Sequence, residues 1–256
     1  MDPGVQAVLF IGALTATLCA GCGQQQKIVK GRQSMFEEDV IRTSAGELTI
    51  AFVGHGTLMF TFDEKVIHVD PVSREADYTQ MPDADLILVT HGHGDHLDPD
   101  AIAEIRTDRT EVVLPPACVS AINGGAVMEN GDSATVAGLP IEAVPAYNIE
   151  HMRDSGEPFH PKGEGNGYII SFGDTRVYVA GDTENTPEMK ALEDIDVAFL
   201  PMNLPYTMTP QMAADAARAF RPAILYPYHY GQTNTSELVA LLADEEDIDV
   251  RIRPMQ

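Results

Sequence analysis

Short apolar runs separated by Gly, Pro and Asp dominate the chain from about residue 48 onwards. Runs of roughly four to eight residues rich in Val, Ile, Leu and Phe, bounded by turn residues, are typical of β-strands. The pattern predicts strands over 48–52, 57–62, 66–69, 86–89, 112–114, 141–146, 167–172, 176–180, 197–200, 223–226 and 250–253. The strands on either side of Gly173-Asp174 are expected to form a hairpin.

Two helices begin with a capping signal. In Asp98-Pro99 and Thr209-Pro210, an N-cap residue precedes a proline suited to the first helical position. Helices are expected over 99–106, 116–122, 210–220 and 236–243. Because hairpins mix with strands that alternate with helices, we predict an α/β fold in which two mixed sheets are covered by helices, in one domain over 47–256. The polar segment 147–166 is long for a loop and is expected to be functional.

The N-terminus has the composition of a targeting segment. Residues 5–20 are apolar and rich in small side chains, and Cys19-Ala20-Gly21-Cys22 follows before a polar stretch. This resembles a bacterial lipoprotein signal with Cys22 as the lipidated residue, although Met1-Asp2-Pro3 lacks the usual positive charge. The resemblance implies a signal peptide over 1–21, a tether over 22–46 and an extracytoplasmic, membrane-anchored protein. A plain secretory signal or a short anchor is the alternative.

Charge and cysteine content narrow the function. The chain has 39 acidic and 16 basic residues and a formal net charge of −23, so its field repels DNA and RNA and we expect no nucleic-acid partner. Hydrophobic residues make up 44% of the sequence, enough for a full core. Three cysteines cannot make a disulfide framework, and Cys118 is expected to be a small buried apolar residue.

A metal-ligand cluster follows the apolar run 86–89. His91-Gly92-His93-Gly94-Asp95-His96 places four ligand-type side chains within six positions, separated only by glycines. Neutral imidazoles and carboxylates are preferred ligands of divalent transition metals. One ion would not use all four from so short a loop, so we assign His91 and His93 to one ion and Asp95 and His96 to a second.

Two further ligands are expected from the second half of the chain. Asp182, in Gly181-Asp182-Thr183, follows the strand 176–180 and is the best candidate to bridge two ions. His229 follows the strand 223–226 in the same way. Ligand sites of sheet proteins gather at the carboxyl ends of strands, where the cluster itself also lies.

These spaced motifs resemble those of the metallo-β-lactamase superfamily. The resemblance implies a four-layer αββα sandwich, two divalent ions, most commonly zinc with manganese as the alternative, and catalytic roles for Asp95 and Asp182. It also implies that Asp70, in Val69-Asp70-Pro71, supports the metal loop without binding metal. The segment Val53-Gly54-His55-Gly56-Thr57 is similar to the branch that contains ascorbate-phosphate lactonases and N-acyl phosphatidylethanolamine phospholipase D.

One ligand of the first ion is not settled by the sequence. The family places a histidine after the strand that ends at Ala146, but this chain has Tyr147-Asn148 there. We prefer His160, because Pro161 and Gly163 can hold a fixed loop geometry around it. His151 is the second candidate, and Asn148 or an incomplete ligand set is the third.

Other polar residues are assigned to structural, substrate-binding or proton-transfer roles. His55 is expected to hydrogen-bond Asp70 or to line the cleft, and His68 is expected to be structural or partly exposed. Asn203 and Lys162 are candidate substrate contacts. Candidates for protonating the leaving group are Tyr228, Tyr230 and His55.

The predicted function is hydrolysis of an ester, lactone or phosphodiester in a small-molecule or lipid substrate by a hydroxide that bridges the ions. The alternatives are a catalytically inactive metal-binding or scaffold lipoprotein, and an iron-dependent redox protein with a flavin partner.

Overall fold

The computed structural model describes Met1 and residues 35–256. The predicted signal peptide beyond Met1, the lipidation candidate Cys22 and the first part of the predicted tether lie outside the described residues. Residues 35–256 form two seven-stranded sheets. No helix in this part of the chain is long and apolar enough to cross a membrane.

The first sheet combines an antiparallel meander with a parallel part. The meander contains β1 (Glu37–Thr43), β2 (Gly46–Gly54), β3 (Thr57–Phe62) and β4 (Lys65–Val69). The parallel part continues from β4 with β5 (Leu86–Leu88), β6 (Glu111–Leu114) and β7 (Ala126–Val127). The strands lie side by side in chain order.

The second sheet repeats this plan. Its antiparallel part contains β8 (Ser133–Val136), β9 (Leu139–Ala146), β10 (Gly165–Phe172) and β11 (Thr175–Val179). Its parallel part continues with β12 (Val197–Pro201), β13 (Ile224–Tyr228) and β14 (Asp249–Val250). The hairpin predicted over Gly173-Asp174 is confirmed as β10 and β11.

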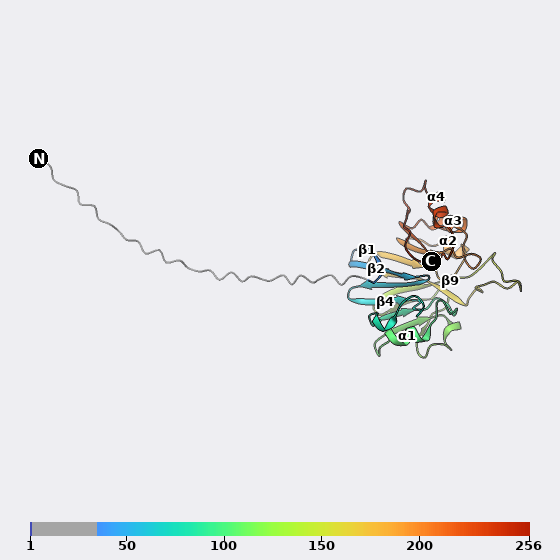
Figure 1. Cartoon of the computed structure of the whole chain (residues 1–256), viewed down its shortest axis with the longest axis horizontal. Helices are drawn as coiled ribbons and strands as arrows, with labels where there is room; N and C mark the ends of the chain where they lie inside the picture. The colour runs from blue at the N-terminus through green and yellow to red at the C-terminus, as the bar shows by residue number, and fades with distance from the viewer. Residues whose placement is uncertain (2–34) are drawn as a thin grey trace. The chain divides into compact units, whose positions relative to one another are not determined.

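Helices cover the outer faces of the sheets, with α1 on the side of β4 and α2–α4 on the opposite side (Figure 1). The helices are α1 (Pro99–Ile105), α2 (Pro187–Lys190), α3 (Pro210–Phe220) and α4 (Thr235–Leu241), with 3-10 turns at Tyr78–Gln80 and Pro116–Cys118. Both predicted N-caps are confirmed, since Asp98 accepts hydrogen bonds from two backbone amides of α1 and Thr209 accepts one from Met212.

The alternation of side chains on the strands separates two cores. On β5, Leu86 and Leu88 join the core between the sheets, whereas Ile87 joins the core under α1. Aromatic rings fill the space between the sheets, where Phe60 packs against Phe172 and Phe199 at 5.7 and 6.1 Å between ring centroids. The predicted αββα sandwich is therefore confirmed.

The predicted tether over 22–46 is wrong for residues 37–43, which form β1 and pair with β2 along its whole length. β1 is an edge strand with mostly exposed side chains, so its sequence lacks the apolar run by which the other strands are predicted. Its Asp39 accepts three hydrogen bonds from Arg253, at 2.7, 2.8 and 3.2 Å. This contact fixes β1 to the second half of the chain.

Three further differences concern short elements. β7, β8 and α2 were not predicted, because two to four residues carry too little periodicity. The helix predicted over 116–122 is only a 3-10 turn at Pro116–Cys118. The last strand is shorter than predicted and ends at Val250.

Candidate metal centre

The candidate site lies where the parallel strands of both sheets end. Asp70 follows β4, His91 lies just after β5, Asp182 lies just after β11, and His229 follows β13. Because the carboxyl ends of parallel strands meet at one edge of a sheet, side chains far apart in sequence are brought together there. All seven ligands predicted from the sequence lie in this region: His91, His93, Asp95, His96, His160, Asp182 and His229.

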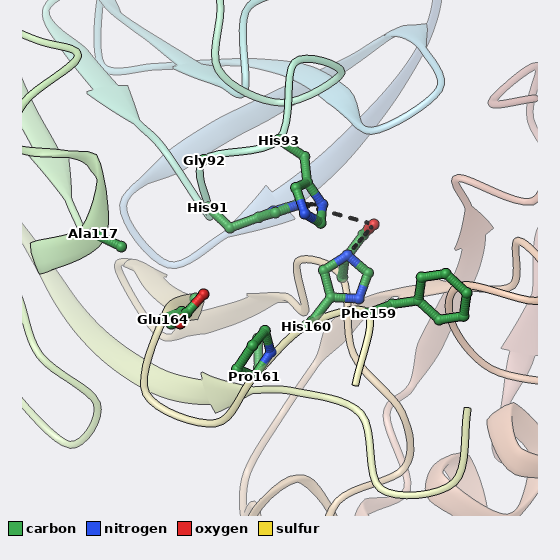
Figure 2. Close-up of a pocket in the computed structure, with 11 residues that line it drawn as sticks. His91, Gly92, His93, Ala117, Phe159, His160, Pro161 and Glu164 are labelled. Atoms are coloured by element: carbon green, nitrogen blue, oxygen red, sulfur yellow. Dashed lines mark hydrogen bonds and ion pairs between the residues drawn. The ribbon is translucent and has the colours of Figure 1, made fainter. Parts of the chain in front are cut away.

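Three histidines form the first ligand group, which we call site A: His91, His93 and His160. Their ligand atoms all lie within 4.8 Å of one another, and Figure 2 shows the three rings pointing toward one another. His91 Nε2 is 3.1 Å from His93 Nδ1. His160 Nε2 is 3.2 Å from Asp182 Oδ2. The group has the donor set of a divalent transition-metal site.

The second ligand group, site B, contains Asp95, His96 and His229, with His55 behind them. Their ligand atoms also lie within 4.8 Å of one another. Asp95 Oδ2 is 3.7 Å from His229 Nε2 and 3.3 Å from His55 Nε2. His55 therefore contacts Asp95, and the expected hydrogen bond to Asp70 is made by His96 instead. The structure places His55 among the groups that can hold a metal.

Asp182 lies between the two sites. Its Oδ2 is 3.2 Å from His160 and 3.5 Å from His229, and its Oδ1 is 3.4 Å from His96. Burial alone would raise the pKa of Asp182, but the imidazoles of His229, His96 and His160 lower it well below its usual range. The carboxylate is thus ionised and faces both sites, as a bridging ligand must be.

The surroundings shift the pKa values of His91 and His96 in opposite directions. Burial lowers the pKa of His91 well below 6.5, and the neighbouring His96 lowers it further, so His91 is a neutral donor. Burial would also lower the pKa of His96, but the carboxylates of Asp182 and Asp70 raise it to about 9. Without metal, the His96 ring is therefore protonated. A metal cation beside the same carboxylates can displace that proton from the ring nitrogen.

Buried atoms without hydrogen bonds show that divalent metal fits this site. His96 Nε2, Asp182 Oδ1 and both ring nitrogens of His229 are buried and have no hydrogen-bond partner among residues 35–256. Buried polar groups are otherwise almost always paired, because an unpaired one costs roughly 1–3 kcal/mol. Metal coordination at sites A and B would satisfy His96 Nε2, Asp182 Oδ1 and His229 Nε2.

Asp70 and Thr90 orient two of the histidines. Asp70 is fully buried, and its Oδ2 accepts hydrogen bonds from His96 Nδ1 at 2.7 Å and from Thr90 Oγ1 at 2.6 Å. Thr90 Oγ1 in turn accepts from His91 Nδ1 at 3.0 Å. Both rings therefore present Nε2 to the site, so Asp70 occupies the supporting position implied by the family resemblance. Thr90 was not predicted, and only its place before His91 could have indicated it.

The structure places His160 in site A and His151 outside it. His160 is buried, and its Nδ1 donates to Asn148 Oδ1 at 2.8 Å, which leaves Nε2 facing Asp182. His151 is partly exposed, and its Nδ1 lies 2.7 Å from Glu184 Oε1. Asn148, the third candidate, orients His160 from behind.

Glu184 is a supporting residue that the sequence did not reveal. It is fully buried and accepts backbone hydrogen bonds from Ile149, Glu150 and His151 at 2.6–2.7 Å. It also accepts from the amide of Asn148 at 3.1 Å. Glu184 therefore links the segment after Asp182 to the loop that contains Asn148, the residue that orients His160. The only sequence signal was its position two residues after Asp182.

Strained backbone turns aim several of these side chains. Asp70 and His229 have φ of 46° and 45°, a left-handed conformation that costs about 1 kcal/mol or more for residues other than glycine. Each directly follows a strand, so the turn directs the side chain across the sheet edge. Gly56 is required for space, because a Cβ there would lie 2.5 Å from His96 Cε1.

The site opens into a cleft with two lobes, both of which are lined by His93, Phe159, His160 and Asp182. The smaller lobe, about 230 Å³, includes Ala117 and Glu164, and the larger, about 340 Å³, includes Arg153, Asn203 and Tyr206. In Figure 2, Glu164 and Pro161 lie on the opposite side of His160 from Phe159. Asn203, a predicted substrate contact, thus lines the cleft.

Several other residues that the sequence analysis considered lie away from the cleft. Tyr228 is fully buried and lines neither lobe, and Tyr230 donates to the backbone oxygen of Arg253, so neither hydroxyl is placed to protonate a leaving group. Lys162 pairs with Glu188 and Tyr147 outside the cleft. His68 is fully buried in contact with Pro82, as a structural residue.

Cys118 is buried, as predicted. Burial raises the pKa of its thiol to about 11, so it is a neutral packing residue.

Comparison with known proteins agrees with this geometry. The β-lactamase superfamily domain matches residues 49–229. The UPF0173 metal-dependent hydrolase of Methanopyrus kandleri is 36% identical over 72% of this chain and 84% of its own length. The chain belongs to the β-lactamase superfamily, in the group of UPF0173 metal-dependent hydrolases.

Solved structures show the same relationship. A protein of Parabacteroides distasonis described as a metal-dependent hydrolase is 53% identical, with a TM-score of 0.82, over 86% of this chain and all of that chain. Igni18, a metallo hydrolase of Ignicoccus hospitalis, is 25% identical with a TM-score of 0.67, over 82% of this chain and 96% of that chain.

Proposed function

We propose that the protein is a dinuclear metal-dependent hydrolase that cleaves an ester, lactone or phosphodiester bond. His91, His93 and His160 hold one ion in this proposal, and Asp95, His96 and His229 hold the other. The observation that carries it is the position of Asp182, whose two oxygens face histidines of both sites. The hydrolases among its relatives support the reaction class.

The side chains divide the work between them. Bound divalent ions lower the pKa of water and polarise the oxygen under attack, and zinc suits the imidazole-rich donor set. Asp182 holds the two sites in register. Asp70, Thr90 and Asn148 fix the histidine tautomers, and fixed ligands need no reorganisation during the reaction.

An inactive scaffold and an iron–flavin redox protein are the competing functions. The ligand set favours the hydrolase over both, because the seven predicted ligands lie close together beside a cleft and site A contains three imidazoles. A buried, ionised carboxylate that faces both sites, as Asp182 does, also supports a hydrolase over a scaffold.

Metal analysis and a hydrolysis screen test this proposal. After loading with zinc or manganese, the full chain should retain about two equivalents of metal. It should hydrolyse at least one member of a panel of phosphodiesters, lactones, esters and phospholipids, and a chelator should abolish that activity. Retention of fewer than one equivalent would overturn the two-metal site, and two equivalents without turnover across the panel would favour the scaffold.

We also propose that the domain acts outside the cytoplasm, tethered by a lipid on Cys22, where a lipid or small-molecule substrate is accessible. The composition of residues 1–26 supports this proposal. Cys22→Ala should move the protein from the membrane fraction to the soluble fraction in cells, whereas Cys19→Ala should not. An unchanged membrane fraction in Cys22→Ala would argue against the lipid anchor.

A further inference from the structure

The larger lobe of the cleft carries an unpaired positive charge. Arg153 is the only arginine or lysine among the residues that line either lobe. Within residues 35–256 it forms no ion pair with a carboxylate, whereas Arg176, Arg218, Arg221, Arg251 and Arg253 all do. In a chain of net charge −23, an arginine left without an acidic partner at the mouth of the site needs an explanation.

The guanidinium of Arg153 is held at the lobe. Its backbone amide donates to the oxygen of Glu157 at 2.7 Å, and its own carbonyl accepts from Gly156 at 2.8 Å, so the turn that carries it is closed. The guanidinium lies 5.1 Å from the centroid of the Phe159 ring, and Nη2 donates to the Phe159 carbonyl at 3.1 Å. The other N–H groups of its fork have no partner in the described residues, and a planar fork suits carboxylate and phosphate.

Asn203 provides a second polar group in the same lobe. Its side-chain amide forms no hydrogen bond within the part of the chain that the structure describes, although its backbone is tied to Thr207 and Tyr206. Gly231 gives it room, because a Cβ there would lie 2.5 Å from Asn203 Oδ1. Tyr206 packs edge-on against Phe159, with 5.0 Å between ring centroids, and supports the Arg153 side of the lobe.

The smaller lobe differs in the side chains that lie outside the candidate metal ligands. Both lobes include Asp182 and the larger one also includes Asp95, but these two carboxylates are candidate metal ligands. The smaller lobe adds the carboxylate of Glu164 and the apolar side chains of Ala117, Ala146 and Pro161, and Glu164 would repel an anionic group there. The two lobes therefore differ in the charge that their side chains outside the candidate ligands present to the cleft.

We propose that Arg153 and Asn203 form an anion-binding subsite, so that the substrate carries a carboxylate or phosphate group in the larger lobe and a neutral group in the smaller one. This inference rests on the proposed hydrolase function, since it specifies the substrate class of the same cleft. Arg153 acts here as a specificity residue and takes no part in metal binding.

A matched pair of esters tests the subsite. The mono-4-nitrophenyl ester of fumaric acid and 4-nitrophenyl crotonate have nearly the same shape and reacting group, but only the first carries a distal carboxylate, and its trans double bond keeps that carboxylate from attacking the ester. In the zinc-loaded full chain, Arg153→Gln should lower kcat/KM about tenfold for the fumarate ester, mainly through KM, and less than about twofold for the crotonate ester. Arg109→Gln is the matched control, because Arg109 is exposed, lies outside the cleft and forms no ion pair within the described part of the chain. Equal losses for both esters would overturn the proposal.

A binding measurement separates failure of the subsite from failure of the hydrolase. Titration of the zinc-loaded chain with inorganic phosphate and with succinate needs no turnover. Arg153→Gln should raise the dissociation constant of at least one of them about tenfold, with zinc content unchanged and with a difference that shrinks as salt is added. A response to phosphate alone assigns a phosphate group, and one to succinate alone assigns a carboxylate. If neither constant changes relative to Arg109→Gln, the subsite is wrong even where hydrolysis is observed.

Discussion

The two halves of the domain share one strand plan but supply their candidate metal ligands in different ways. In the first half, four ligands come from a single loop after β5, between His91 and His96. In the second half, each ligand comes from a different place: His160 from the loop between β9 and β10, Asp182 after β11, and His229 after β13.

The aspartates at matching strand ends show the consequence most clearly. β4 and β11 each form the junction between the antiparallel and parallel parts of a sheet, and Asp70 and Asp182 follow them. Asp70 is buried behind His96 and orients it, whereas Asp182 faces both sites. The same position in the plan thus orients a histidine in one half and, in the other, places a carboxylate between the two candidate sites.

Replacement of Asp182 should have the largest effect. Asp182→Ala removes the carboxylate that faces both sites, so metal content should fall at sites A and B together, and kcat/KM should fall roughly 100-fold or more. Metal analysis and hydrolysis assays measure this, with Glu193→Gln, an exposed carboxylate of the same half, as the control. Loss of only one equivalent would show that the second half does not join the two sites.

The loop between β9 and β10 provides a sharper test. His160→Ala should lower metal affinity at site A about 10- to 100-fold, because it removes one of three imidazoles. His151→Ala should leave affinity within about twofold, since that ring lies against Glu184 outside the site. Competitive titration with a metal chelator measures both. Greater loss in His151→Ala would reverse the assignment.

Replacement of a supporting residue should weaken both metal sites in the first half but only one site in the second half. Asp70→Asn should weaken both sites about tenfold, because Asp70 holds His96 directly and His91 through Thr90. Asn148→Ala should weaken site A alone by a similar factor, because it holds only His160. Stepwise metal titration distinguishes the two patterns. Equal effects on both sites in Asn148→Ala would contradict separate support.

The contact of β1 with the second half should give the smallest effect. Burial raises the pKa of Asp39, but hydrogen bonds from Tyr226 and Arg253 lower it more, so its folded pKa lies below 3.8. Its contribution is therefore present above pH 4 and is lost as the pH falls through the folded pKa.

Asp39→Asn should lower the free energy of unfolding by about 1 kcal/mol or less at pH 7, and the difference from wild type should shrink below pH 4. Urea denaturation at several pH values measures this, with the exposed Asp63→Asn as the control. A difference that grows as the pH falls would contradict the assigned pKa shift.

Local patterns were sufficient for much of the fold. Apolar runs such as 86–89 and capping pairs such as Asp98-Pro99 predicted elements that the structure contains. β1 was missed because an edge strand buries little, and its place depends on Arg253, more than 200 residues away in the chain.

The sequence by itself determined the kind of site, since four ligand-type side chains within six positions, followed by Gly181-Asp182-Thr183 and a late histidine, are typical of divalent-metal binding. Tertiary structure alone decided between His160 and His151, because that choice depends on which ring lies over Asp182. It also decided that Asn148 and Glu184 support the site and that Arg153 faces the cleft. Ligand identity is a local property of side chains, whereas ligand geometry depends on which strand ends meet at the edge of two sheets.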